Sequence, residues 1–253
     1  MSDLKDRVAV VMGASGEHSF GSTIARLFAE KGASVVVAAR REGPLRALAE
    51  EIGGLAVACD ISEDEQLEAL TGRVMEQYGR IDIAVNAAGM LAWGPIAKLR
   101  EKDILPTVKT SFVGSLLFFK HMGNAMAAGG GGSVMTLSSQ TAQLPGAGQC
   151  VYSAARAGID YAVKIAAHEY GPQGVRFNSI AAGLIETDMT EVVFQNRELI
   201  DDFIRKTPLR RMGSLEDVAR AALWLADESA SGFVTGEVIS VAGGGQNGTL
   251  PGS

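Results

Sequence analysis

Short apolar runs alternate with amphipathic segments from one end of the chain to the other. The runs lack polar alternation, which is typical of strands that are buried on both faces. They cover Val8–Met12, Ser34–Ala39, Leu55–Cys59, Ile81–Val85, Ser133–Leu137, Val175–Ile180 and Val238–Val241. In the amphipathic segments, apolar residues recur three and four positions apart and so predict helices. These helices are expected at Ser22–Lys31, Glu63–Tyr78, Asp103–Ala128, Cys150–Tyr170 and Glu216–Ala226.

Seven strands separated mainly by helices, with short connections, predict a single α/β domain over residues 1–253. The expected architecture is a Rossmann-type, doubly wound, parallel seven-stranded sheet with helices on both faces. The glycine tract Gly129–Gly132 is interpreted as a turn, because a strand follows it at once. Residues 187–208 break the rhythm and are rich in apolar side chains. They predict a small helical flap over the carboxyl edge of the sheet, where such folds bind ligands.

Composition narrows the classes of partner. The 253 residues include 23 Lys and Arg against 29 Asp and Glu, a net charge of −6. This acidic balance argues against nucleic acid or an anionic membrane as the main partner. The amino-terminal segment lacks the apolar region of a signal peptide, and no apolar stretch approaches the ~20 residues of a membrane helix, so a cytoplasmic protein is expected. Cys59 and Cys150 are too few for a zinc site or a disulfide framework, and no metal site is predicted.

A glycine-rich turn follows the first predicted strand and leads into a helix. Such a turn lets backbone amides approach a pyrophosphate at the positive end of the helix. An ordinary glycine-rich turn is the alternative, but the strand–loop–helix context favours the phosphate site. The candidate contacts are Gly13, Ser15, Ser19, Phe20 and Gly21.

Two arginines, Arg40 and Arg41, end the second strand, where a dinucleotide fold meets the adenosine ribose. An acidic residue there would favour NAD, whereas arginine can hold a 2′-phosphate. The sequence therefore predicts NADP(H) in preference to NAD(H), although a solvated charge pair is the simpler alternative. Asp60, followed by Ile61, comes directly after the third strand and can accept a hydrogen bond from the adenine amino group.

The fourth strand is followed by a run of small residues that lets the chain pass close to a cofactor. The residues expected there are Asn86, Ala87 and Gly89.

Three side chains form the candidate catalytic group. Tyr152 and Arg156 are four residues apart on one helix, so their side chains share a face, and Ser139 ends the fifth strand. A tyrosine with a pKa near 10 is a poor base at neutral pH, and a permanent cation one turn away stabilises its phenolate. Ser139 can hold a substrate oxygen beside the phenol. The alternative is a packed aromatic residue and a turn serine, which the nearby nucleotide motifs disfavour.

Together these motifs resemble those of the short-chain dehydrogenase/reductase family over nearly the whole chain. The matching features are Gly13 to Gly21, Asp60, Asn86-Ala-Ala-Gly89, Ser139, Tyr152-Ser-Ala-Ala-Arg156, Asn178-Ser-Ile-Ala-Ala-Gly183 and Thr235-Gly236. The resemblance implies that the tyrosine moves a proton on the substrate oxygen while hydride passes to or from the nicotinamide, and that the serine orients that oxygen. It implies cofactor contacts from Tyr152 and Arg156, and a homotetramer. By the same resemblance, Gly183, Ile185 and Thr187 are expected beside the cofactor.

Several positions depart from the family pattern. Arg156 replaces a lysine that normally also contacts the nicotinamide ribose, and this exchange is not conservative. Ser111 stands where the family has an asparagine that supports a proton relay, so it is the fourth candidate catalytic residue. The glycine loop is two residues longer than usual and resembles that of the branch containing enoyl reductases. That branch places its tyrosine seven residues before the lysine, where this chain has Gln149.

Two other functions remain open at this stage. The Ser–Tyr–Arg set is similar to that of halohydrin dehalogenases, which are lyases without a cofactor, but these would leave Asp60 and Arg40 without a task. A nucleotide-binding protein with impaired catalysis is the other alternative.

The substrate itself is only broadly indicated. Met90, Leu91 and Trp93, with Leu144 to Gly146 and the flap, suggest a moderately large apolar carbonyl compound or alcohol. Apolar flap residues that simply pack together are an equal alternative.

Overall fold

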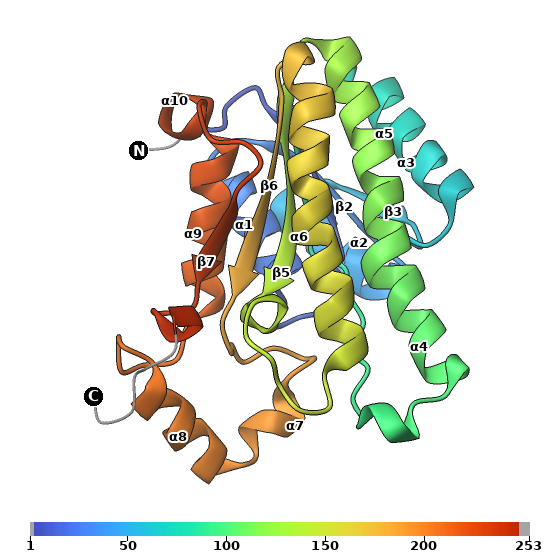
Figure 1. Ribbon diagram of the computed structural model, residues 1–253. Coiled ribbons are helices and arrows are strands. Elements are labelled where there is room, and N and C mark those ends of the chain that lie inside the picture. Colours follow the sequence, from blue (N-terminus) through green and yellow to red (C-terminus); the bar gives the residue numbers. More distant parts are fainter. Residues whose placement is uncertain (1–2, 248–253) are drawn as a thin grey trace.

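Seven parallel strands form one sheet in the order β3-β2-β1-β4-β5-β6-β7 (Figure 1). This computed structural model describes residues 3–247. The strands are β1 (Val8–Met12), β2 (Ser34–Ala39), β3 (Leu55–Ala58), β4 (Ile83–Asn86), β5 (Gly132–Ser139), β6 (Val175–Ala182) and β7 (Val238–Val241). The order reverses between β1 and β4, and folds of this type bind ligands outside the carboxyl ends of the strands at this point. The doubly wound fold predicted from the sequence is confirmed.

Helices cover both faces of the sheet. The α-helices are α1 (Phe20–Glu30), α2 (Glu42–Ile52), α3 (Asp64–Tyr78), α4 (Glu101–Val108), α5 (Gly114–Gly129), α6 (Cys150–Tyr170), α7 (Glu191–Phe194), α8 (Arg197–Lys206), α9 (Leu215–Ala226) and α10 (Glu228–Ser231). Short 3₁₀ turns lie at η1 (Ile96–Lys98), η3 (Gln140–Ala142), η4 (Gly171–Gln173) and η5 (Gly245–Asn247), and a π-helical turn at η2 (Lys109–Val113). The apolar sides of α1, α2 and α9 pack on one face, and those of α3, α5 and α6 pack on the other.

The core consists of two apolar layers that share the central strands. Val11 and Val37 face α1 and α9, whereas Val10 and Val36 face α3 and α5, and all four are fully buried. Side chains alternate between the two faces of a strand, so a strand covered on both sides needs apolar residues at every position. This explains why the predicted strands read as unbroken apolar runs.

The sequence did not predict the helix α2. In α2, Leu45, Leu48 and Ala49 are buried on one face, which is the ordinary helical spacing. Gly43 and Pro44 at its start are typical of a turn and mask this pattern, yet proline is tolerated in the first turn of a helix.

The long helix predicted over Asp103–Ala128 is interrupted. It is divided into α4, the π-helical turn η2 and α5, and Pro106 lies within α4. Such turns insert one extra residue per turn and are frequent at functional sites. Ser111, a predicted site residue, lies in this turn and is fully buried.

The segment 187–208 contains the two helices α7 and α8, which lie beyond the carboxyl ends of the strands (Figure 1). Neither helix contains a fully buried residue, and Val192 is 77% exposed. In the part of the chain that the structure describes, no helix has the length and apolar character needed to cross a membrane.

Candidate active site

The turn after β1 packs closely against β4 and the start of α1. Gly13 has a φ of 87°, and a Cβ atom there would lie 2.6 Å from the backbone nitrogen of Ala88. A Cβ atom on Gly21 would lie 2.6 Å from the carbonyl oxygen of Gly13. Only glycine fits such close approaches. This close packing brings the backbone of the loop to the amino end of α1, where phosphates bind in folds of this type.

The side chains of Ser19 and Phe20 make contacts inside the protein. Ser19 caps α1: its hydroxyl accepts from the amide of Ser22 at 3.2 Å and donates to the carbonyl oxygen of Gly16 at 3.0 Å. Phe20 packs partly buried against the core. The hydroxyl of Ser19 is thus hydrogen-bonded within its own loop.

The segment 187–208 contacts the glycine loop directly. The amide of Asp188 donates to the carbonyl oxygen of His18 at 3.0 Å, and the amide of His18 donates to the Asp188 carboxylate at 3.4 Å. A cavity of about 430 Å³ lies beside this pair, lined by His18, Glu186, Thr187, Asp188, Glu191 and Leu215. The two-residue extension of the loop thus lies against the flap, a contact that the sequence did not predict.

The two arginines after β2 have different surroundings. Arg41 donates to the carbonyl oxygen of Ser15 at 2.9 Å and to its hydroxyl at 3.3 Å, so it lies against the glycine loop. Arg40 is 70% exposed, with its guanidinium 3.9 Å from the carboxylate of Asp60. That carboxylate also accepts from the amide and hydroxyl of Ser62. Ile61 is buried, and its carbonyl oxygen lies under Gly114.

Hydrogen bonds to buried groups hold the residues after β4 in place. Asn86 is fully buried; its amide group donates to the hydroxyl of Ser115 at 2.9 Å, and its oxygen accepts from the amide of Ala88 at 3.0 Å. The amide of Ala87 donates to the carbonyl oxygen of Met12, which ties this turn to β1. The hydroxyl of Ser111 accepts from the amide of Met90 at 3.2 Å. Ser111 therefore supports the backbone of the loop that leaves β4.

Tyr152 and Arg156 are brought together on α6. The guanidinium carbon of Arg156 lies 5.3 Å from the centroid of the Tyr152 ring, and Arg156 is only 4% exposed. Its Nη1 donates to the carbonyl oxygen of Leu137 at 2.8 Å, and its Nη2 donates to that of Ala88 at 3.3 Å. Nη2 also lies so close to Gly89 that a side chain there would overlap it. Arg156 thus connects α6 to the ends of β4 and β5.

Ser139 ends β5 and caps η3, which packs against α6. Its hydroxyl oxygen accepts from the amide of Thr141 at 3.2 Å and from the hydroxyl of Thr141 at 3.0 Å. Two accepted hydrogen bonds leave the Ser139 proton available for donation. Within residues 3–247, the hydroxyl of Tyr152 has no hydrogen-bond partner.

The segment after β6 carries the remaining predicted contacts. The amide of Gly183 donates to the carbonyl oxygen of Val241, and a Cβ atom on Gly183 would lie 3.0 Å from the Cα of Ala242. The carbonyl oxygen of Ile185 accepts from the Thr190 hydroxyl at 2.7 Å, and Thr187 donates its amide to the same hydroxyl at 2.9 Å. One threonine side chain therefore orders the turn into the flap.

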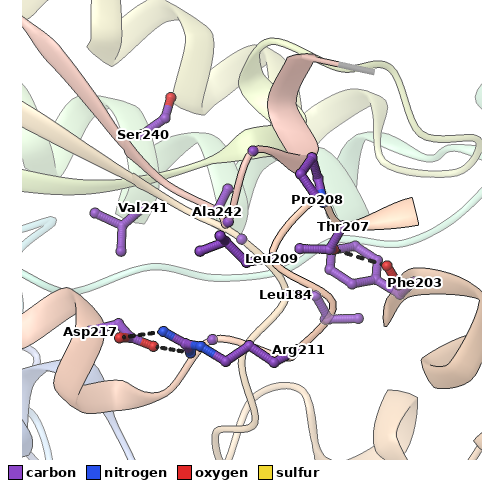
Figure 2. Close-up of a pocket in the computed structure, with 14 residues that line it drawn as sticks. Leu184, Phe203, Thr207, Pro208, Leu209, Arg211, Asp217, Ser240, Val241 and Ala242 are labelled. Atoms are coloured by element: carbon purple, nitrogen blue, oxygen red, sulfur yellow. Dashed lines mark hydrogen bonds and ion pairs between the residues drawn. The ribbon is translucent and has the colours of Figure 1, made fainter. Parts of the chain in front are cut away.

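Figure 2 shows a cavity of about 500 Å³ between the ends of β6 and β7 and the segment 203–213. Phe203, Thr207, Pro208 and Leu209 line it, and Arg211 pairs with Asp217 beside it at 2.7 and 3.0 Å. The Arg211 guanidinium holds the pKa of Asp217 well below its usual range. Tyr152, Ser139 and the glycine loop are not among its lining residues, so this cavity is separate from the candidate catalytic group.

Apolar side chains remain exposed on the loop after β4 and on the segment 187–208. Trp93 is 64% exposed and packs beside Gly148, while the amide of Gly94 donates to the carbonyl oxygen of Gly148. The loop after β4 thus meets the loop that precedes Tyr152. Further exposed apolar residues on this loop and on the flap are Met90, Ile96, Met189, Val192 and Leu199.

Comparison with known proteins identifies the family. A family model described as enoyl-(acyl carrier protein) reductase matches residues 13–246. The chain belongs to the short-chain dehydrogenase/reductase family. Among its relatives is the short-chain dehydrogenase reductase ATA1 of Arabidopsis thaliana, which is 36% identical over 95% of this chain and 93% of the relative.

Solved structures of short-chain dehydrogenases/reductases share the whole fold. A short-chain type dehydrogenase/reductase from Mycobacterium ulcerans superposes with a TM-score of 0.93 and is 31% identical, covering 97% of this chain and 92% of that one. A 7α-hydroxysteroid dehydrogenase, solved with NADH and 7-oxo glycochenodeoxycholic acid, superposes with a TM-score of 0.89 at 30% identity, covering 96% and 95%. The predicted family is therefore confirmed.

Members of the short-chain dehydrogenase/reductase family bind nicotinamide cofactors, and the residues of this chain fit such a group. Glycine is required at Gly13 and Gly21, where bare backbone meets the amino end of α1, and the exposed Arg40 stands at the end of β2. Sequence reasoning missed Asp160, a buried acid on the same face of α6 as Tyr152 and Arg156. The repeated spacing of four residues could have revealed it.

Proposed function

We propose that the protein is an NADP(H)-dependent oxidoreductase that interconverts an alcohol and a ketone. The observation that carries the proposal is the position of Arg156, whose buried guanidinium lies 5.3 Å from the ring of Tyr152 while the phenol oxygen has no partner within the described chain. A tyrosine that faces a fixed guanidinium and whose hydroxyl is open to a substrate is suited to moving a proton.

The glycine loop and the ends of β2, β3 and β4 are proposed to hold the cofactor. Backbone groups of Gly13, Ser15 and Gly21 would face the phosphates at the start of α1, with Ser19 and Phe20 shaping that loop. Arg40 would hold the 2′-phosphate of NADP(H), and Arg41, through Ser15, would keep the loop beneath it. The other proposed contacts are Asp60, Ile61, Asn86, Ala87, Gly89, Tyr152, Arg156, Gly183, Ile185 and Thr187.

Ser139 and Tyr152 would bind the substrate oxygen together. The Ser139 hydroxyl accepts two hydrogen bonds from Thr141, so its proton is free to be donated to that oxygen. Tyr152 gives its proton to the oxygen during reduction and takes it back during oxidation. When bound, the nicotinamide ring supplies or accepts the hydride at the carbon atom. Ser111 supports this centre by holding the backbone of Met90.

The exposed apolar residues on the loop after β4 and on the segment 187–208 support a moderately large, apolar carbonyl compound or alcohol as substrate. Trp93 and Ile96 come from the loop after β4, and Met189 and Val192 come from the segment 187–208, which is proposed to close over the substrate as a flap. The amphipathic α8 would carry that flap.

We also propose a homotetramer in the cytoplasm. Exposed apolar side chains lie on η2, α5 and α6, namely Val113, Leu116, Tyr161 and Ile165, and we propose that they meet a second copy of the chain. Size-exclusion chromatography with light scattering would give four times the chain mass of 26.4 kDa. A monomeric mass would contradict the assembly without bearing on the reaction.

The function is tested in two steps. Titration with NADPH, followed by cofactor fluorescence, should show saturable binding that is tighter than the binding of NADH. A panel of apolar ketones should then oxidise NADPH in the presence of the enzyme.

Absence of binding at millimolar NADPH would exclude the proposal, and binding without turnover on any ketone would favour an impaired nucleotide-binding protein. Halide release from a vicinal haloalcohol would instead indicate a dehalogenase, which the reductase and dehydrogenase names of the relatives do not favour.

A further inference from the structure

A third polar residue of α6 continues the row formed by Tyr152 and Arg156. Asp160 lies one further turn along the helix and is 8% exposed. One oxygen of its carboxylate accepts from the hydroxyl of Ser138 at 2.9 Å, and the other accepts from the hydroxyl of Ser179 at 2.6 Å. Both serines are themselves buried. A single carboxylate thus joins α6 to β5 and β6.

The helix that carries this carboxylate has an apolar inner side. Ile159 and Val163, its neighbours on the inner side of α6, are fully buried in the apolar layer between helix and sheet. Burial raises the pKa of Asp160, although the hydroxyl groups of Ser179 and Ser138 and the charges of Arg156 and Lys164 oppose this shift. A buried carboxylate costs more than an apolar side chain of similar size unless its hydrogen bonds are made. The Asp160 carboxylate is therefore expected to have a role other than packing.

The strand held by this carboxylate is the one that ends in Ser139. Arg156 holds the carbonyl oxygen of Leu137, Asp160 holds the side chain of Ser138, and the next residue is Ser139. Two successive residues of β5 are therefore fixed to the helix that carries Tyr152. Because backbone shifts pass directly to the next residue, the place of Ser139 relative to Tyr152 depends on these contacts.

We infer that Asp160 is a positioning residue, which acts through Ser138 to set the distance between the hydroxyl groups of Ser139 and Tyr152. The inference rests on the proposed function, since the two hydroxyl groups must meet one substrate oxygen. Asp160 itself does not touch the reacting atoms in this assignment. Displacement of either hydroxyl by about an ångström is expected to slow turnover while leaving the cofactor site intact.

The two serines offer a matched pair of variants. Ser138→Ala and Ser179→Ala each remove one buried hydroxyl that donates to the same carboxylate. Only Ser138 adjoins Ser139. With NADPH and the best ketone of the panel, we expect Ser138→Ala to lower kcat at least tenfold, with the Kd for NADPH within twofold of wild type. Ser179→Ala should change kcat less than threefold despite a similar loss of thermal stability.

A coupling test assigns the effect to the carboxylate. Asp160→Ala should lower kcat at least as much as Ser138→Ala does. The double variant that carries both substitutions should have a kcat no lower than that of Asp160→Ala alone. If Asp160→Ala does not fold, the comparison of the two serine variants still decides. Equal losses of kcat in Ser138→Ala and Ser179→Ala, or full activity in Ser138→Ala, would overturn the assignment.

Hydrogen exchange gives a second readout that does not need turnover. In Ser138→Ala, amides of residues 137–141 should exchange at least tenfold faster than in wild type, whereas Ser179→Ala should leave them within threefold. If the wild-type protein reduces no ketone, the proposed function fails. The hydrogen-exchange rates alone then test whether Asp160 positions this segment. Unchanged exchange of 137–141 in Ser138→Ala would then refute it.

Discussion

The guanidinium of Arg156 faces the ring of Tyr152 at 5.3 Å and is held there by two backbone carbonyl oxygens, those of Leu137 and Ala88. The charge is therefore fixed by β4 and β5 as well as by the helix that carries both residues. Nε of Arg156 is buried and has no hydrogen-bond partner among the described residues. The guanidinium that faces the Tyr152 ring is thus both buried and held in place.

Tyr152→Phe removes the proposed acid–base group and little else. We expect kcat with NADPH and a reactive ketone to fall at least a thousandfold, because no other hydroxyl replaces the phenol. The Kd for NADPH should stay within about threefold. Tyr161→Phe, on an exposed side of the same helix, is the control and should be fully active. An active Tyr152→Phe enzyme would refute the acid–base role.

Arg156→Lys keeps the charge but cannot reproduce both hydrogen bonds of the guanidinium. A lysine ammonium cannot match the planar fork that reaches both Leu137 and Ala88, so the variant should lose about 1–3 kcal/mol of unfolding free energy. Turnover should be kept, because a cation still lies near Tyr152. Urea denaturation and initial rates measure the two effects separately. Loss of kcat without loss of stability would show that the chemistry needs the guanidinium itself.

Gly89→Ala tests the space around the guanidinium. A methyl group at this position would overlap Nη2 of Arg156, so the side chain must move away from Ala88. We expect kcat to fall about tenfold and the unfolding free energy to fall by about 1–3 kcal/mol. Gly72→Ala is the control: no atom lies within 4 Å of the added methyl group in α3, so stability should rise by about 0.5–1 kcal/mol. Unaltered kinetics in Gly89→Ala would argue against this packing.

Arg40→Ala tests the choice of cofactor. The Kd for NADPH should rise at least tenfold, because a charge-assisted contact to the 2′-phosphate is lost, whereas the Kd for NADH should change less than twofold. Arg46→Ala removes a comparably exposed arginine of α2 and should affect neither Kd. Equal weakening of NADPH and NADH would place Arg40 outside the 2′-phosphate site.

Asp82 should make stability depend on pH at the acidic end. Its burial favours the neutral acid, but hydrogen bonds from Arg80, the amide of Val8 and Arg7 outweigh this and lower the pKa of the carboxyl. A lowered pKa in the folded state stabilises the fold above the unfolded pKa near 3.9, and this stabilisation is lost as the pH falls through the folded value. Asp82→Asn should therefore cost about 1–3 kcal/mol at pH 7 and less at pH 3.

Urea denaturation of Asp82→Asn and wild type at both pH values measures this difference. Asp201→Asn, at an exposed position of α8, is the control and should have no effect at either pH. A penalty for Asp82→Asn that is the same at pH 3 and pH 7 would contradict the proposed cause.

Sequence patterns predicted the sheet well because its strands are buried on both faces. Val10 and Val11 point to opposite sides and are both apolar, so the run is distinctive. The start of α2 was hidden by Gly43 and Pro44, which are equally common in turns. Strand ends were also placed short: β5 runs on to Ser139, where small polar residues replace the apolar ones.

In the candidate site, the sequence predicted which residues share one face of a helix. It did not predict contacts between segments that are distant in the chain. Tyr152 and Arg156 were found because they share a face of α6. The pairing of His18 with Asp188, 170 residues apart, depends on how the flap folds over the sheet. The engagement of the Ser19 hydroxyl within its own loop is a matter of local geometry that composition does not reveal.

The anchorage of Arg156 on backbone oxygens has a practical value for engineering. Every amino acid supplies a carbonyl oxygen, so the guanidinium keeps its contacts when side chains around the pocket are exchanged. Exposed positions such as Trp93, Met189 and Val192 can therefore be randomised to change substrate scope without rebuilding the centre that moves the proton. A library built on this chain should retain a high proportion of active members.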